Sequence, residues 1–121
     1  MAAVRYIVND IEESIPFYRD ALGFEVKMKA DGFAALSRDD LILFLNVPGK
    51  GSAGKAGGHP QPGGWSRFQV ETKDLDATIA ALRKSTQRFR GDVASGPGGR
   101  QILVEDPSGN VVEFFERAQS R

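Results

Sequence analysis

The same order of structural signals occurs twice in this chain, and this repeat limits the possible fold more than any other feature. In each half, a segment of alternating apolar and polar residues is followed by an aspartate and then by apolar residues at helical spacing. The two aspartates, Asp10 and Asp74, lie 64 residues apart, and the same shift places Ser14 on Thr78. Each half therefore predicts a β-α-β-β-β module, and the chain as a whole predicts an α+β fold made of two such modules.

The first module begins with a strand pattern at residues 2–8. Asp10 is suited to cap the following helix, with Glu13 at the spacing of a capping box, and Gly23 is suited to end it. Pro16 lacks a backbone donor, so we expect a kink or an irregular turn at that point. Three short strands should follow, at residues 24–29, 33–37 and 40–46.

The second module repeats this order with a strand pattern at residues 65–72 and a helix capped by Asp74. The glycine-rich run Gly96-Pro97-Gly98-Gly99 lacks both the Lys-Ser/Thr ending and the helix start of a phosphate loop. It is typical of a hairpin turn instead. Three further strands are predicted, at residues 91–95, 100–105 and 110–116.

Residues 48–64 have a different composition from both modules. They hold seven of the fourteen glycines and three of the six prolines, together with Lys50 and Lys55 and no acid. Such a segment is typical of a flexible linker or of a loop over a site. We therefore predict one domain, residues 1–121, with module one at 2–47, this loop at 48–64 and module two at 65–117.

The charge and composition exclude several classes of partner. The 121 residues include sixteen basic and sixteen acidic side chains, so no net field favours nucleic acid or an anionic membrane. No stretch approaches the roughly 20 apolar residues that cross a bilayer, and the first residues lack the pattern of an export signal. Cysteine is absent from the sequence, which excludes disulfides and thiolate metal sites. We expect a cytoplasmic protein.

Two stretches carry a family resemblance: residues 8–24, with the run Ser14-Ile15-Pro16-Phe17-Tyr18, and residues 106–114, with the turn Asp106-Pro107-Ser108-Gly109-Asn110. They resemble the helix signature and the closing turn of the glyoxalase/bleomycin resistance/extradiol dioxygenase superfamily, also called the vicinal oxygen chelate superfamily. The resemblance implies that each module curls its sheet into a half-barrel, that two half-barrels enclose a cavity, and that the protein forms a homodimer. It says little about activity, because the superfamily includes lyases, dioxygenases, epimerases and antibiotic-binding proteins.

The resemblance also marks four positions at which metal-dependent members hold their ion. These positions fall on Ala3, Leu43, Arg67 and Glu113. Only Glu113 has a suitable donor atom, and the permanent charge of Arg67 would repel a divalent cation. The sole imidazole, His59, lies in the loop and not on a strand. We therefore expect no metal and no other cofactor.

The residues at these positions suggest a small-molecule site in place of the metal. Arg67 and Glu113 should form an ion pair, while an apolar hollow with a few polar groups is the usual form of a ligand site. Guanidinium groups would favour an acidic group on an organic ligand. The residues that we assign to ligand binding are Arg5, Leu43, Arg67, Gln69, Glu113 and Phe115. A purely structural role for the ion pair, and a neutralising role for Arg5, are the competing interpretations.

Two other functions remain open at the level of sequence. The first is an enzyme, either a metal-dependent lyase or dioxygenase with displaced ligands or a cofactor-free catalyst with Glu113 as its base. Arg67 disfavours the latter, because it stabilises the carboxylate in its charged, paired form. The second is a protein-interaction module with exposed apolar patches. Trp65, which starts a strand beside the loop, is compatible with a lid contact, an interface or ordinary packing.

Overall fold

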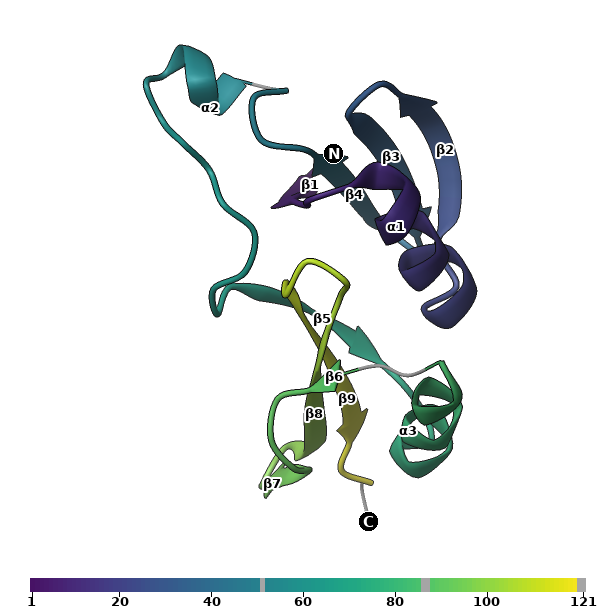
Figure 1. Ribbon diagram of the computed structural model, residues 1–121. Helices are drawn as coiled ribbons and strands as arrows, with labels where there is room; N and C mark the ends of the chain where they lie inside the picture. Colours follow the sequence, from purple (N-terminus) through teal and green to yellow (C-terminus); the bar gives the residue numbers. More distant parts are fainter. Residues whose placement is uncertain (51, 86–87, 120–121) are drawn as a thin grey trace. The chain divides into compact units, whose positions relative to one another are not determined.

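The computed structural model describes residues 1–50, 52–85 and 88–119. The chain divides into two compact units (Figure 1). Unit one consists of Met1–Gly63 with Pro107–Asn110, and unit two of Gly64–Asp106 with Val111–Arg121. None of the helices in the described part of the chain is long and apolar enough to span a membrane.

Unit one is a four-stranded sheet with helical turns against one face (Figure 1). The strands have the order β1-β4-β3-β2, in which β1 and β4 are parallel and the other pairs antiparallel. Its elements are β1 (Ala3–Ile7), α1 (Ile11–Pro16), a π-helical turn η1 (Phe17–Ala21), β2 (Glu25–Ala30), β3 (Phe33–Arg38) and β4 (Leu41–Asn46). The predicted strands of module one are all present, with bounds that differ by at most one residue.

The irregular helix predicted at Pro16 is confirmed. The α-helical hydrogen bonding ends at Pro16, and the chain continues as the π-helical turn. Gly23 then ends the helical segment with a φ of 75°, in the left-handed region that glycine enters at little energetic cost. The turn buries Tyr18 completely, and its ring makes edge-on contacts with Phe17 at 4.9 Å and Phe24 at 5.7 Å between ring centres.

The predicted cap of this first helix is wrong. The side chain of Asp10 accepts no capping hydrogen bond. Its main-chain oxygen instead accepts from the amide of Ser14 at 3.1 Å and from the Ser14 hydroxyl at 2.7 Å. Asp10 therefore starts the helix through its backbone alone.

Unit two is a five-stranded sheet with one longer helix. Its strand order is β5-β9-β8-β6, with β7 paired to β8. The elements are β5 (Arg67–Glu71), α3 (Leu75–Lys84), β6 (Arg88–Phe89), β7 (Ala94–Gly96), β8 (Gly99–Glu105) and β9 (Val111–Arg117). The side chain of Asp74 accepts from the amide of Ala77 at 3.0 Å, so the predicted cap of α3 is confirmed.

The strand predicted at 91–95 is wrong as a single element. Two short strands, β6 and β7, take its place, because a turn with Gly91 at a φ of 82° separates them. The predicted hairpin at Gly96-Pro97-Gly98-Gly99 is present, with Gly96 paired to Gly99. At Gly99, with a φ of 147°, an added Cβ would lie 2.1 Å from the carbonyl oxygen of Glu116, so only glycine fits there.

The loop after β4 contains a helical turn, and the side chain of Asn110 ties this loop to β1. The predicted loop at 48–64 contains one helical turn, α2 (Ser52–Lys55). The buried side chain of Asn110 links the loop to β1: it accepts from the amide of Gly63 at 2.8 Å and donates to the carbonyl of Ile7 at 2.7 Å. Residues Pro107–Asn110 of the predicted turn at 106–110 therefore belong by their contacts to unit one, and Asp106 belongs to unit two.

Candidate ligand-binding site

Each sheet has one face packed on its helix and one opposite face, which we call the open face. In unit two the strand register places Arg67, Gln69 and Glu71 of β5 on the same face as Val111, Glu113 and Phe115 of β9. The alternate residues of β5, Phe68 and Val70, are buried in the core. The expected juxtaposition of the polar β5 residues with Glu113 on one open face is therefore present.

Arg67 and Glu113 form the ion pair expected from the sequence. Nε of Arg67 donates to Oε1 of Glu113 at 2.8 Å. The Glu113 side chain is only 10% exposed, whereas that of Arg67 is 34% exposed. The carboxylate thus depends on the guanidinium for neutralisation, because it has little contact with water.

The remaining predicted residues of unit two line the same face without a comparable bond. Gln69 lies directly opposite Glu113 in the parallel pairing and is exposed. Phe115 is half-buried. At the far end of the same strands, Arg117 pairs with Glu71 at 2.8 Å in a much more exposed position.

Trp65 lies two residues before the start of β5 and is 67% exposed. The guanidinium of Arg90 lies over its ring, 4.4 Å from the ring centre, and Nε of Arg90 donates to Oε2 of Glu105 at 2.7 Å. Arg90 also donates to the carbonyl of Gly64 at 2.6 Å. The ion pair thus holds Arg90 in place, and the cation–π contact supports one face of the exposed indole.

The open face of unit one carries Arg5, as predicted. Its β1 position pairs with Phe44 of β4, and its guanidinium lies over that ring at 5.0 Å from the centre. Arg5 also donates to the side-chain oxygen of Asn46, whose amide nitrogen in turn donates to the carbonyl of Lys50. These contacts hold the guanidinium between the sheet and the loop that follows β4.

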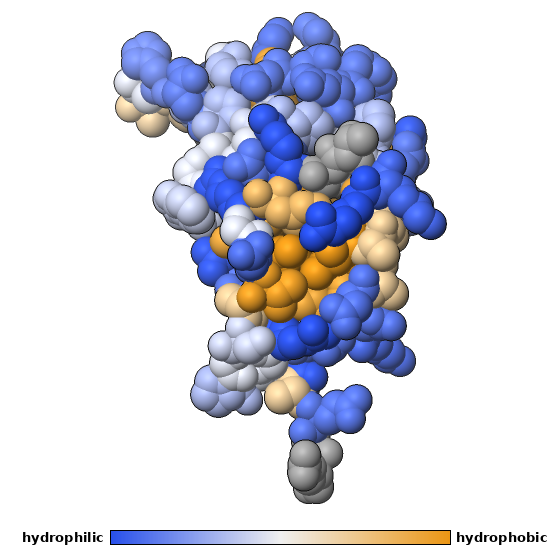
Figure 2. All heavy atoms as spheres, turned by 60° about the horizontal axis from the view of Figure 1, so that its bottom comes forward, coloured by the Kyte–Doolittle hydropathy of each residue, from blue (hydrophilic) through white to orange (hydrophobic). Residues whose placement is uncertain are grey.

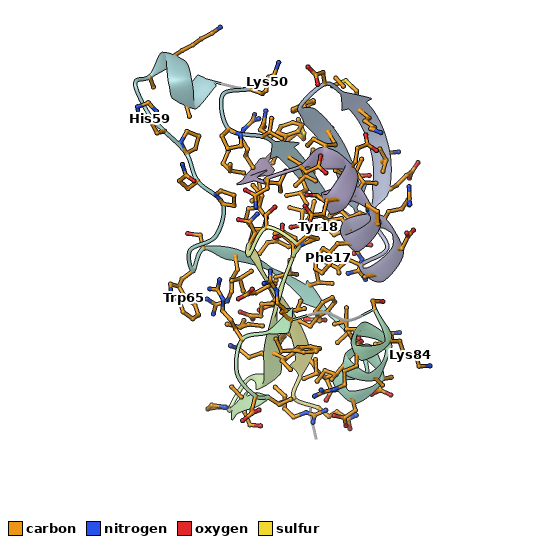
Figure 3. The ribbon with its side chains drawn as sticks, in the orientation of Figure 1. Phe17, Tyr18, Lys50, His59, Trp65 and Lys84 are labelled. Carbon is orange, nitrogen blue, oxygen red and sulfur yellow. The ribbon has the colours of Figure 1, made fainter. Side chains whose placement is uncertain are left out.

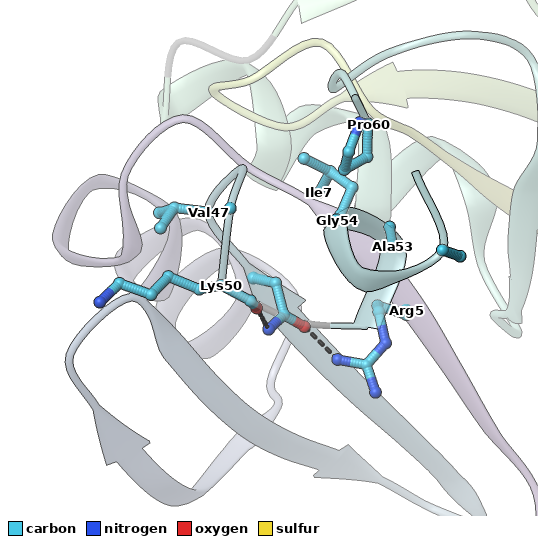
Figure 4. Close-up of a pocket in the computed structure, with 10 residues that line it drawn as sticks. Arg5, Ile7, Val47, Lys50, Ala53, Gly54 and Pro60 are labelled. Atoms are coloured by element: carbon cyan, nitrogen blue, oxygen red, sulfur yellow. Dashed lines mark hydrogen bonds between the residues drawn. The ribbon is translucent and has the colours of Figure 1, made fainter. Parts of the chain in front are cut away.

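That loop covers a cavity of about 170 Å³ on the open face of unit one (Figure 4). One side is formed by β1 and the end of β4, and the other by the turn of α2 with Ala53 and Gly54. The lining residues are Arg5, Ile7, Asn46, Val47, Gly49, Lys50, Ala53, Gly54, Ala56 and Pro60. Of the two roles predicted for residues 48–64, a linker or a loop over a site, the second remains a prediction, and the structure shows that this loop lines a cavity.

The prediction that Leu43 lies with Arg5 on this face is wrong. Leu43 pairs with Val4 and Leu36, is fully buried, and belongs to the core under the helical turns. Phe44, the next residue of β4, takes the position beside Arg5 on the open face that was predicted for Leu43. The error is a shift of one residue, and a shift of one in a strand moves every side chain to the opposite face.

The described residues do not fit a metal ion. Across residues 1–50, 52–85 and 88–119, no three His, Asp or Glu side chains are grouped so that they could hold one. Of the four positions that the resemblance marks, Glu113 alone has a donor atom, and it is bonded to Arg67. Figure 3 shows His59 on the extended segment after α2, and its side chain is exposed.

A family model described as the Glyoxalase/Bleomycin resistance protein/Dioxygenase superfamily matches residues 1–114. The chain belongs to this superfamily. A bleomycin resistance protein from Geobacillus stearothermophilus is 26% identical to it over 123 aligned positions, which cover 93% of each chain. The glyoxalase-superfamily assignment thus rests on nearly the whole length of the protein.

Solved structures of the superfamily have the same fold. A member from Sphaerobacter thermophilus gives a TM-score of 0.80 at 24% identity, covering 97% of this chain and 96% of its own. TnmS3, an antibiotic binding protein from a Streptomyces species, gives 0.73 at 24% identity, covering 96% and 93%. At these identities the likeness establishes the fold and not the ligand.

Two residues of the candidate site, Phe44 and Asn46, are not predicted from the sequence pattern. Phe44 was missed because the strand register was one residue off. Asn46 was missed because a polar residue at the end of an apolar strand looks like the start of a turn. The sequence signal for Asn46 is its position, because it ends a strand that otherwise consists of Leu, Ile and Phe. In the structure Asn46 is only 4% exposed, and its buried amide needs hydrogen-bond partners.

Proposed function

We propose that this protein binds a small organic molecule with an acidic group on the open faces of its sheets, without a bound metal or other cofactor. The Arg67–Glu113 ion pair is the observation that carries the proposal. Glu113 is the single metal-capable residue at the marked positions, and its carboxylate is bonded to a permanent cation at 2.8 Å. A divalent ion would have to displace that guanidinium from a largely buried carboxylate.

The relatives support binding as the function. The curated relatives that match along 93% of the chain are bleomycin resistance proteins, and one of the fold neighbours is an antibiotic binding protein. Arg5 supports the acidic character of the ligand, because it faces the unit-one cavity with an amide and an aromatic ring as its contacts. A guanidinium in that setting favours a carboxylate or phosphate group.

The first test is the metal content of the purified protein, measured by mass spectrometry and followed by calorimetric titration with manganese, nickel, zinc and ferrous ions. The proposal expects no stoichiometric metal and no binding heat. A tightly held ion near one per chain would overturn it and would favour the metal-dependent lyase or dioxygenase.

The second test is a thermal-shift screen with acidic, neutral and basic small molecules, antibiotics included. Ligands that bind only the folded state raise the melting temperature with concentration. We expect acidic compounds to give the stabilising hits, and Arg5→Gln to weaken them more than Lys84→Gln. Both variants remove one positive charge, but Lys84 lies at the exposed end of α3. Hits confined to basic or neutral compounds would contradict the acidic-ligand proposal.

We also propose a homodimer. Each sheet presents edge strands, such as β2 in unit one, and sheet edges are commonly covered by a partner. Figure 2 shows a patch of hydrophobic residues bordered by hydrophilic ones, and patches of this kind are often covered by a two-fold partner. Light scattering at micromolar concentration should give twice the 13.1 kDa chain mass. A monomer under those conditions would contradict this proposal.

A further inference from the structure

The cavity of unit one combines apolar walls with polar groups on one side. Five of its lining residues offer aliphatic or ring carbon: Ile7, Val47, Ala53, Ala56 and Pro60. The polar groups are the side chains of Arg5 and Asn46 and the backbone carbonyl of Lys50, whose ammonium group points away from Arg5 and pairs with Asp31 at 3.4 Å. A molecule that fits these walls must therefore have an apolar body and one polar end.

The guanidinium of Arg5 can bind an anionic group at the polar end of such a molecule. None of the ion pairs among the described residues includes Arg5. One guanidinium nitrogen donates to Asn46, and the ring of Phe44 supports the group from one face. A guanidinium has five N–H donors in a fixed fork, so most of them are left for a ligand. A carboxylate can accept two of them at once.

On the open face of unit two, by contrast, arginines are paired with acidic side chains. There Arg67, Arg90 and Arg117 each pair with a glutamate at 2.7 to 2.8 Å. The segment that covers the unit-one cavity contains two lysines and no acid between residues 48 and 64. The charge of Arg5 is thus left without an acidic partner among the described residues of unit one, whereas these three arginines of unit two are neutralised.

The volume limits the size of the ligand. A cavity of about 170 Å³ is close to the roughly 150 Å³ that holds one benzene ring in an engineered protein core. It is smaller than the roughly 300 Å³ at which drug-sized pockets begin. The cavity therefore fits one six-membered ring or a branched chain of similar size, and not a whole antibiotic.

We infer that this cavity binds a carboxylic acid whose apolar body is about the size of one ring, with the carboxylate on Arg5 and the ring between Ile7, Val47 and the turn of α2. The inference rests on the proposed function and deepens it, since it places the acidic group of the ligand in unit one. A larger ligand would insert its acidic, ring-bearing end here.

The test is an NMR titration of the full ¹⁵N-labelled chain with benzoate and, separately, with benzamide. Benzamide has the same ring and nearly the same shape but no charge. We expect benzoate to bind in the millimolar range that a ligand of so few atoms can reach, and benzamide about tenfold more weakly. The shifted signals should be those of Arg5, Asn46 and residues 53–60. The indole signal of Trp65, the single tryptophan, lies in unit two and should not move.

Two variants test the assignment independently. Arg5→Gln should weaken benzoate binding by about tenfold or more, while Lys84→Gln, which removes the same charge elsewhere, should leave it unchanged. Gly54→Leu should abolish binding by filling the cavity. An added Cβ at Gly54 meets no atom within 4 Å, so the wild-type fold accepts a side chain there. Lys55→Leu adds the same side chain one residue along, outside the cavity lining, and should bind benzoate as the wild type does.

The outcomes separate this inference from the proposed function. Equal affinity for benzoate and benzamide, or binding that Arg5→Gln and Gly54→Leu leave intact, would overturn the inference. If benzoate fails to bind while larger acidic compounds still raise the melting temperature, the cavity assignment is wrong and the proposed function stands. If a stoichiometric metal is found but benzoate binds through Arg5, the proposed function is wrong and the cavity assignment stands.

Discussion

Replacing Arg67 by methionine should destabilise the protein more than replacing Glu113 by glutamine, although both changes break the same ion pair. The asymmetry follows from burial, since the Glu113 side chain is 10% exposed and that of Arg67 is 34% exposed. Without Arg67, a carboxylate is left in the sheet with neither a cation nor full hydration. Without the carboxylate, the guanidinium reaches water and can still donate to the glutamine oxygen.

The size of the effect can be bounded from the same exposures. Removing one partner of a fully buried pair costs about 3–5 kcal/mol. About a third of the Arg67 side chain contacts solvent, so screening reduces that cost. We expect the free energy of unfolding to fall by about 2 kcal/mol in Arg67→Met and by about 1 kcal/mol in Glu113→Gln. The double variant should lose only about 1.5 kcal/mol, since neither residue then leaves an unpaired charge. The coupling energy of the pair is therefore about 1.5 kcal/mol.

Urea unfolding followed by circular dichroism measures all three free energies, and the chain offers a matched control. Arg117 and Glu71 lie on the same two strands, also at 2.8 Å, but their side chains are 73% and 50% exposed. The same cycle there should give a coupling below about 0.5 kcal/mol. Equal coupling in the two cycles, or a larger loss from Glu113→Gln than from Arg67→Met, would refute the reasoning from burial.

Three further predictions concern the fold, each measured as a change in the free energy of unfolding. Asp74→Ala should cost about 1 kcal/mol because a capping bond is lost, while Asp10→Ala should cost clearly less; equal losses would mean that Asp10 also caps its helix in solution. Gly99→Ala should cost about 2 kcal/mol or more through strain and a backbone clash, whereas Gly96→Ala, where an added Cβ meets open space, should be nearly neutral. Asn110→Leu should cost about 2–3 kcal/mol, because two backbone groups lose their side-chain partner; a loss under about 0.5 kcal/mol would show that water replaces both bonds.

The repeat of local signals was sufficient to predict the α+β fold and most of its strands. Alternation and helical spacing are properties of neighbouring residues, so they can be recognised without tertiary information. The sequence does not predict correctly which of the two aspartates caps its helix through its side chain. Asp10 and Asp74 occupy equivalent positions with the same side chain, yet only Asp74 accepts from an amide of its helix. The cap depends on the geometry of the first turn, which the aspartate alone does not determine.

The candidate site was predictable in part, and the division has a physical cause. The Arg67–Glu113 pair was found because charged residues in a strand are conspicuous and must be neutralised when buried. The face of Leu43 was not found, because the strand Leu41–Asn46 is apolar at five consecutive positions and then ends in an amide. Alternation carries no information in such a strand, so only its pairing with neighbouring strands determines which side chains point to the open face.

The one-residue correction leaves the metal hypothesis unchanged but alters the ligand hypothesis. Phe44 is as incapable of binding a metal as Leu43, so the marked position lacks a donor in either register. For a ligand the difference is large, because the open face of unit one now presents an aromatic ring and the amide of Asn46 in place of leucines. Both residues contact Arg5, and together they fix the direction of its guanidinium. The preference for an acidic ligand therefore depends on two residues that hold Arg5 in place, and substituting Asn46 should weaken carboxylate binding although Asn46 carries no charge.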